Sequence, residues 1–197
     1  MIDTLVNIDK EIFIAIHTGL ANPVLDWLMP ILRDAKTWAP LYLFFVVLAV
    51  RKYKAQGVYI VLATVLIVVL TDRFSAGFMK PFFERLRPCH EPGLAAYIRN
   101  LIDCGGQYGF ISSHATNHFG MAVMFTWFFK KVSTMTYLNW VFYVWAGIIS
   151  FAQVYVGKHY PGDVIVGMIC GILIGKIILT ILTKLKVIKN LSLKTNN

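Results

Sequence analysis

The chain alternates long apolar runs with short polar connections, and the lengths of the runs determine the expected fold. A helix needs ~20 predominantly apolar residues to cross a bilayer. Three runs reach about that length, and two further runs, which are shorter or carry polar residues, are bounded by charged residues. We expect these runs to form spanning helices: residues 57–79, 137–157, 163–183, 37–51 and 114–130. The pattern therefore predicts an all-α, polytopic membrane helix bundle.

The N-terminal region, residues 12–32, does not fit a single spanning helix. It is apolar overall but contains His17, Asn22, Pro23 and Asp26. Such a region is either a broken spanning segment, or an interfacial helix followed by a re-entrant one. The bundle is accordingly expected to have five to six transmembrane helices.

Composition agrees with a membrane protein. Of the 197 residues, 57% are hydrophobic and 15% are charged, and the mean hydropathy is +0.64. Soluble domains are less apolar and carry ~25% charged residues. We expect one integral membrane domain over residues 1–197. The net charge of +9 comes mainly from short connections and the C-terminus, so the expected partners are membrane lipids with anionic headgroups, and no nucleic acid. The pattern gives no indication of an oligomeric state.

The distribution of basic residues predicts the orientation in the membrane. Lys and Arg are enriched in cytoplasmic loops. Three connections carry such residues: Arg51, Lys52 and Lys54; Lys130 and Lys131; and Lys184, Lys186, Lys189 and Lys194. The opposite face then holds the loop 80–110 and the turn 158–162. We expect these two polar segments to face outward, periplasmic or extracellular, from a plasma or inner membrane of bacterial type.

A pair of cations comes first among the candidate functional residues. Pro81 is expected to end the helix that delivers Lys80, and Pro88 interrupts the chain directly after Arg87. If the segment between them is helical, Lys80 and Arg87 lie near one face and can bind one anion such as phosphate. The alternative is that both cations reach toward lipid headgroups.

A second polar group stands where the run 114–130 begins. Ser112 and Ser113 are good N-cap residues, and a helix N-terminus is a ready anion site. His114 would lie beside whatever anion binds there. Asn117 and His118 fall one turn further along on roughly the same face, as supporting partners or as packing groups. An ordinary helix cap explains the two serines equally well.

The third group is His159 with Asp163, separated by a turn that contains Pro161. An Asp that accepts the Nδ1–H of a histidine fixes its tautomer and leaves Nε2 free as a nucleophile or base. Asp163 can also cap the last helix, and the two roles are compatible.

Three motifs follow one another, each between apolar segments: Lys-x6-Arg-Pro from Lys80, Ser-x-His from Ser112 and Gly-x-His-x3-Asp from Gly157. In this order they resemble the motifs of the type 2 phosphatidic acid phosphatase superfamily of membrane lipid phosphatases. The resemblance covers about residues 72–167. It implies a core helix bundle with the site at the membrane surface. It also implies a phosphatase reaction through a phosphohistidine, without metal or cofactor.

Carried onto matching positions, the resemblance makes His159 the nucleophile, Asp163 its orienter, and His114 the proton donor to the leaving group. The expected phosphate-binding residues are Lys80, Arg87, Ser112, Ser113 through its backbone, and Gln153.

The chain departs from the family pattern at three places. Ile111 stands where the family has Pro, Ser113 where it has Gly, and Ala152-Gln153 where it has Ser-Arg. The last change removes a cation, and charge-assisted bonds to phosphate are roughly twice as strong as neutral ones. Gln153 should therefore bind phosphate less tightly unless another cation replaces the lost charge. The candidates from sequence are Lys158, Arg85 and His90.

Two cysteines flank the outer polar loop. Cys89 and Cys104 can form a disulfide if that loop faces an oxidising compartment, and otherwise remain free thiols. The loop 89–108 contains both cysteines, and we expect it to form a lid or rim that selects the substrate. Gly105, Gly106 and Gly109 give the end of this loop freedom to move.

Several functions compete with or refine the phosphatase hypothesis. His114, His118, His159 and Asp163 could form a metal site, although the nearby cations would repel a metal ion. A phospholipid transporter or binding protein could use the same cations to bind a headgroup. A lipid-to-lipid phosphotransferase of the same fold is a further alternative.

Within the phosphatase hypothesis the substrate should be amphiphilic, because the site opens at the lipid–water boundary. Undecaprenyl pyrophosphate, phosphatidylglycerophosphate, phosphatidic acid and the phosphates of lipid A all fit. The sequence interpretation favours a polyprenyl or glycerophospholipid phosphate, with lipid A as the alternative.

Overall fold

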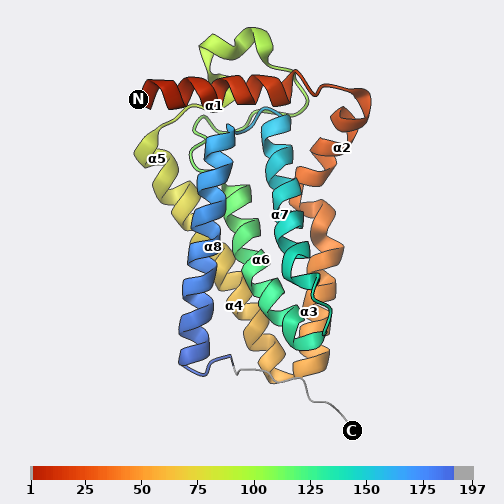
Figure 1. Cartoon of the computed structure of the whole chain (residues 1–197). Helices are drawn as coiled ribbons and strands as arrows, with labels where there is room; N and C mark the ends of the chain where they lie inside the picture. Colours follow the sequence, from red (N-terminus) through yellow and green to blue (C-terminus); the bar gives the residue numbers. More distant parts are fainter. Residues whose placement is uncertain (1, 189–197) are drawn as a thin grey trace.

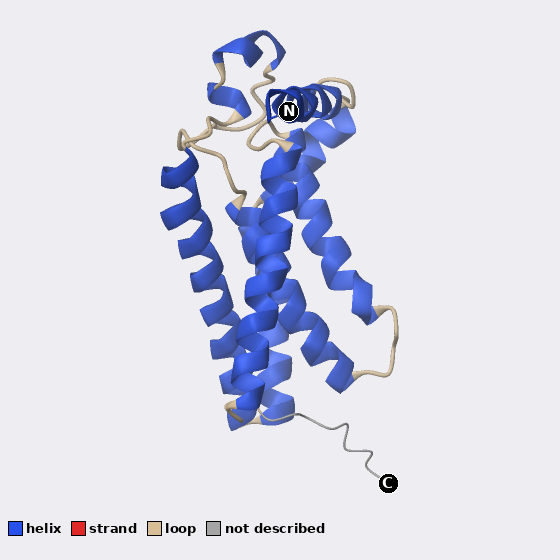
Figure 2. Ribbon diagram, turned by 60° about the vertical axis from the view of Figure 1, so that its left-hand side comes forward, coloured by secondary structure: helices blue, strands red, loops and turns tan. Residues whose placement is uncertain are grey.

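The computed structural model describes residues 2–188, and in that range the chain is a helix bundle (Figures 1 and 2). The long elements are α1 (Ile2–His17), α2 (Pro23–Arg33), α3 (Ala39–Tyr53), α4 (Ala55–Asp72), α6 (Ser113–Val132), α7 (Leu138–Tyr155) and α8 (Pro161–Lys184). The shorter ones are η1 (Ala35–Trp38), η2 (Arg73–Met79), α5 (Lys80–Phe83), η3 (Pro88–His90) and η4 (Pro92–Tyr97). The prediction of an all-helical protein is confirmed for this part of the chain.

The N-terminal region forms two helices rather than one. Helix α1 lies across one end of the bundle, and α2 runs from that end alongside α7 (Figure 1). Pro23 occupies the first turn of α2, and the side chain of Asn22 accepts hydrogen bonds from the N–H groups of Val24 and Leu25. Helix α2 does not turn back as a re-entrant helix would. It leads through η1 into α3, so residues 23–53 form one interrupted helical column.

The helix that delivers Lys80 does not end at Pro81, contrary to the sequence prediction. Helices α4, η2 and α5 are continuous from Ala55 to Phe83 because η2 is a π-helix. The N–H of Lys80 bonds to the carbonyl of Ser75, five residues back. The wider turn displaces the carbonyl that the ring of Pro81 would meet in an α-helix. Residues 84–87 then leave the helix, so Lys80 and Arg87 do not share a helical face.

Helix α6 lies at the centre and packs against α4, α7 and α8. Its core side chains are large and apolar, among them Phe125 and Phe128, both buried. Toward α8 the packing depends on small residues. Gly167, Gly171 and Gly175 of α8 are buried at one-turn intervals and let the two backbones approach closely.

The two ends of the bundle differ in chemistry. At one end the last turns of α3 and α6 meet, and Tyr53 donates a hydrogen bond to the carbonyl of Lys131 at 3.1 Å. The predicted cytoplasmic residues Arg51 to Lys54, Lys130, Lys131, Lys184 and Lys186 belong to this end (Figure 1), whereas Lys189 and Lys194 lie outside the described residues. The other end carries α1 and the loop 84–112.

Two helices of the described chain, Ala55–Phe83 and Pro161–Lys184, are long and apolar enough by themselves to cross a membrane. The remaining columns are shorter, interrupted or, like α6, less apolar.

Candidate active site

His159 lies in the turn between α7 and α8, at the end of the bundle covered by α1. Its side chain is buried, and its Nδ1 is 3.5 Å from Oδ2 of Asp163. The same Oδ2 accepts the N–H of Tyr160 at 3.0 Å, so Asp163 closes the first turn of α8 while facing the imidazole. The turn therefore places the carboxylate on the Nδ1 side of His159.

Arg85 links the carboxylates of Asp163 and Asp9 and so holds Asp163 in place. Arg85 donates to Oδ1 of Asp163 and to Oδ2 of Asp9, both at 2.7 Å. The other oxygen of Asp9 accepts the N–H of Gly162 at 2.7 Å. Arg85 also lies over the ring of Tyr160, 4.1 Å from its centroid. Helix α1 is thus connected through Asp9 to the start of α8.

Lys80 and the two serines meet at the start of α6. Nζ of Lys80 donates to Oγ of Ser113 at 2.9 Å, and Ser75 donates to the same oxygen at 2.9 Å. Ser112 is the N-cap of α6, as its position in the sequence predicts. The N–H of Ser112 bonds to the carbonyl of Asp163 at 3.0 Å, which joins the start of α6 to the start of α8.

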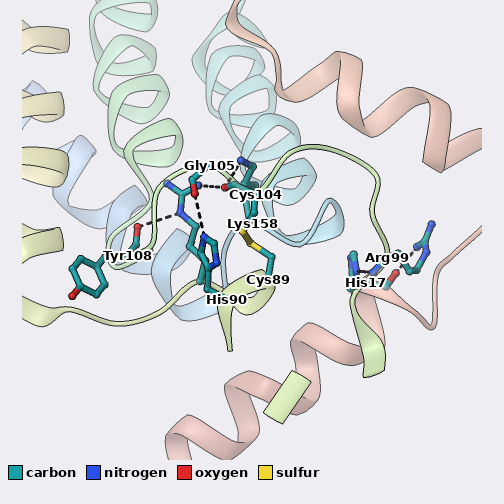
Figure 3. The surroundings of a disulfide bond; sticks show 9 residues. His17, Cys89, His90, Arg99, Cys104, Gly105, Tyr108 and Lys158 are labelled. Carbon is teal, nitrogen blue, oxygen red and sulfur yellow. Dashed lines mark hydrogen bonds between the residues drawn. A yellow bond between two sulfur atoms is a disulfide. The ribbon is translucent and has the colours of Figure 1, made fainter. Parts of the chain in front are cut away.

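Arg87 and Lys158 converge on one carbonyl. Arg87 donates to the oxygen of Cys104 at 2.8 Å. Nζ of Lys158 donates to the same oxygen at 2.5 Å, and Figure 3 shows Lys158 beside Cys104. Cys104 is joined to Cys89 by a disulfide with a Cα–Cα distance of 6.1 Å. Arg87 also donates to the carbonyl of Tyr108 at 3.2 Å. The loop 84–112 therefore positions two cations next to His159.

His114 is half-buried in the first turn of α6, and its charge is close enough to interact with those of His159 and Lys80. His118, one turn on, has both ring nitrogens occupied. Its Nδ1 contacts the carbonyl of His114 at 2.7 Å, and its Nε2 contacts the hydroxyl of Tyr42 at 3.1 Å. His118 is accordingly a packing and supporting group.

Gln153 has a cation partner that the sequence analysis did not name. Its Oε1 accepts from Nε of Arg33 at 3.4 Å, and its Nε2 is buried without a hydrogen-bond partner. Arg33 is the last residue of α2. None of the replacements proposed from sequence contacts Gln153 through its side chain. Arg85 is paired with two carboxylates, and the exposed His90 contacts the carbonyl of Gly105.

Burial and the neighbouring cations lower the pKa values of two residues in the turn, Lys158 and His159. Desolvation, followed by the charges of Arg87 and Arg33, lowers the pKa of Lys158 to about 8. Desolvation also lowers the pKa of His159, and the charges of Arg87 and Lys80 act in the same direction, against the opposing effect of Asp163. His159 is therefore neutral at a lower pH than an exposed histidine.

The described residues offer one group of metal-ligand types close together: Cys89, His90 and Cys104. Two of these are joined in the disulfide. The four residues of the metal hypothesis do not form such a group, since His118 already contacts Tyr42 and the backbone.

The structure thus brings eight predicted site residues to one end of the bundle, from α5, α6, α7, α8 and two loops: His159, Asp163, His114, Lys80, Arg87, Ser112, Ser113 and Gln153. It adds Arg33 and Asp9, which sequence reasoning missed. The sequence marks Arg33 only as a charged residue at the end of an apolar segment. Its distance along the chain from the three motifs gives no indication that it lies beside them.

An all-helical bundle with paired imidazoles, a buried aspartate and clustered cations at one end defines a class of membrane phosphatase. The PAP2 superfamily model matches residues 56–186, and the chain belongs to that superfamily and is a membrane lipid phosphatase.

Two curated relatives carry the name lipid A 4'-phosphatase. The protein from Bacteroides thetaiotaomicron is 30% identical over 175 residues, which is 87% of this chain and 75% of that protein. The one from Porphyromonas gingivalis is 29% identical over 175 residues, 87% of this chain and 71% of that protein.

Solved structures share the fold. The first transmembrane PAP2 type phosphatidylglycerolphosphate phosphatase from Bacillus subtilis has a TM-score of 0.68 at 19% identity, covering 94% of this chain and 90% of that one. Aquifex aeolicus LpxE has a TM-score of 0.59 at 22% identity, covering 86% and 93%.

Proposed function

We propose that this protein hydrolyses a phosphate monoester of a lipid A-type glycolipid through a phosphohistidine formed on His159. The observation that carries the proposal is the buried His159, with Asp163 beside its Nδ1 and with Arg87 and Lys80, which have no carboxylate partner among the described residues, close enough for their charges to act on it. Such a group suits in-line attack on a phosphate whose charge must be neutralised.

The chemistry divides between two imidazoles. Nε2 of neutral His159 attacks phosphorus, the bond between phosphorus and the lipid oxygen breaks, and His114 gives its proton to that oxygen. Water then attacks the phosphohistidine, His114 takes a proton from the water, and inorganic phosphate leaves. Lys80, Arg87 and the N-terminus of α6 stabilise the equatorial oxygens in both steps.

The choice of substrate rests on the relatives. Both curated relatives act, by name, on lipid A, and each aligns with most of this chain. This favours the alternative that the sequence interpretation placed second, over a polyprenyl or glycerophospholipid phosphate. The site at the end of an apolar bundle is suited to any of these amphiphiles, so the assay must compare them.

The proposed topology has five crossing columns, α2–α3, α4–α5, α6, α7 and α8, with α1 in the outer interface. Helix α1 supports this position because Leu5, Ile8 and Ile12 expose apolar side chains along it. The basic residues at the opposite end support an active site that faces the periplasm or the exterior.

The test is phosphate release from lipid A, undecaprenyl pyrophosphate, phosphatidylglycerophosphate and phosphatidic acid in detergent, with and without EDTA. We expect lipid A to be hydrolysed fastest, with the rate unchanged by EDTA. Replacing the nucleophile by His159→Gln should lower kcat by ~10⁴-fold or more, and His114→Gln by ~10²- to 10⁴-fold. The exposed His90→Gln is the matched control and should keep full activity.

Faster hydrolysis of another lipid would replace lipid A as the substrate and leave the mechanism standing. An acid-labile phosphoryl group on His159, trapped by rapid quench with labelled substrate, is the expected intermediate. Full turnover by His159→Gln would reject the phosphohistidine.

A further inference from the structure

Arg33 is a half-buried cation that has no ion-pair partner among the described residues. Its Nε donates to Oε1 of Gln153 at 3.4 Å, and no carboxylate of the described residues lies within 4.0 Å of its guanidinium. Asp34, the next residue, instead caps η1 by accepting the N–H of Lys36 at 3.0 Å. Positioning an unpaired guanidinium against the apolar column α7 is costly unless an anion joins it.

Arg33 belongs to a group of cations beside His114 and the turn that contains His159. Its charge interacts with those of Arg87 and Lys158, and Arg87 in turn interacts with Lys80. None of these four side chains forms an ion pair in the described part of the chain, whereas Arg85 and Arg99 do. We call Arg33, Lys80, Arg87 and Lys158 the cation cluster.

Gln153 is the side chain that holds Arg33. Because Arg33 is a donor only, Gln153 must present its oxygen to Nε, and its amide nitrogen then points elsewhere. That nitrogen is buried with no partner, and a buried donor without a partner marks a place for an acceptor. Gln153 therefore orients the guanidinium and offers one donor of its own.

We infer that Arg33 is a phosphate-binding residue, which supplies from α2 the guanidinium that the family pattern has on α7 at the position of Gln153. With Nε engaged by Gln153, both terminal nitrogens of Arg33 are free to bind two oxygens of one phosphate. Nε2 of Gln153 donates to the same group. This inference rests on the proposed function and extends the site beyond residues 56–186, the part that the family model matches.

The inference predicts that the two side chains are exchangeable. Moving the guanidinium back to α7 while removing it from α2, in the double variant Arg33→Gln/Gln153→Arg, keeps one cation and one amide in the same place. Gln153→Arg alone sets two guanidinium groups side by side without an intervening acceptor, which costs energy.

The experiment compares Arg33→Gln, Arg33→Lys and the double variant with the unchanged protein, using the best substrate of the panel. We expect Arg33→Gln to lower kcat/KM by ~10- to 10²-fold, the value of one charge-assisted pair. Arg33→Lys should lose less, and the double variant should recover at least ~10-fold over Arg33→Gln. Arg51→Gln, an exposed arginine at the far end of α3, is the matched control.

Binding of inorganic phosphate to the inactive His159→Gln protein, followed by calorimetry, gives a readout that needs no turnover. Adding Arg33→Gln should weaken that binding by a similar factor. If the unchanged protein releases no phosphate from any lipid, the proposed function fails, and phosphate binding still tests Arg33.

Three outcomes would overturn the inference. The first is wild-type kcat/KM and phosphate affinity in Arg33→Gln. The second is a folded double variant, judged by gel filtration and thermal unfolding, that is no better than Arg33→Gln. If Arg33→Gln does not fold, the third is a folded Arg33→Lys or double variant that binds no phosphate.

Discussion

The close contact between α6 and α8 provides a sharp test of how the site is assembled. Gly167 of α8 lies one turn after Asp163 and faces the start of α6. A Cβ built on Gly167 would lie 2.9 Å from the carbonyl oxygen of Ser112 and 3.1 Å from Cβ of Ala115, whereas ordinary contacts begin at 3.4 Å. Gly167→Ala must therefore push the two helix starts apart by about 0.5 Å, with the backbone as the obstacle.

The expected cost follows from that displacement. Overpacking of this kind destabilises by ~1–3 kcal/mol, and since 1 Å of misplacement can cost ~10²-fold in rate, half of it should lower kcat by about 10-fold. The control is Gly147→Ala on α7, where a Cβ would meet nothing within 4 Å. That variant should gain up to ~1 kcal/mol from helix propensity.

Thermal unfolding in detergent and kcat for phosphate release measure both effects. A Gly167→Ala protein as stable and as fast as the unchanged one would refute the argument that close backbone approach sets the position of Ser112 relative to Asp163.

Two further predictions concern the charges of the site. Because the pKa of Lys158 is lowered to about 8, its charge is lost as pH rises through that value, so kcat/KM should fall above pH 8. In Lys158→Arg the fall should become shallower because this side chain stays charged, and an unchanged profile would assign the fall to another group. Asp9→Asn removes one of the two carboxylates with which Arg85 pairs. The free energy of unfolding should fall by ~1–3 kcal/mol, and kcat should drop several-fold. An unchanged melting midpoint would contradict a role for α1 in holding the site.

The sequence predicted the bundle because hydropathy and helix caps act locally. The run 163–183 became α8, Pro161–Lys184, and the run 137–157 became α7, Leu138–Tyr155. Ser112 caps α6 as its type and position predict. The motif residues lie at one end because each motif stands at the boundary of an apolar run, and alternate boundaries must fall on the same side of a membrane.

The parts that could not be predicted depend on contacts between distant segments. Nothing near Arg33 in the sequence indicates that α2 lies beside α7, so its pairing with Gln153 emerges only from packing. Pro81 is a helix breaker by local rules, and the π-helix that accommodates it has no local signature. The same holds for Asp9, whose partners Arg85 and Gly162 lie far along the chain.

The loop 84–112 is cross-linked within itself and attached to α1 and α2, which has a consequence for how molecules enter and leave the site. The disulfide ties Cys89 to Cys104. Between these two cysteines, the backbone N–H of Arg99 donates to Nε2 of His17 at 2.9 Å (Figure 3). The guanidinium of Arg99 pairs with Asp26.

Because Arg99 holds the cross-linked segment to α1 and α2, a movement of the whole segment would have to break these contacts. The glycines near Cys104 give freedom only to its last few residues. A bulky lipid would have to approach the site laterally, within the plane of the bilayer, while inorganic phosphate leaves past the loop into water. Separate routes for substrate and product would let the lipid stay in the bilayer throughout the reaction.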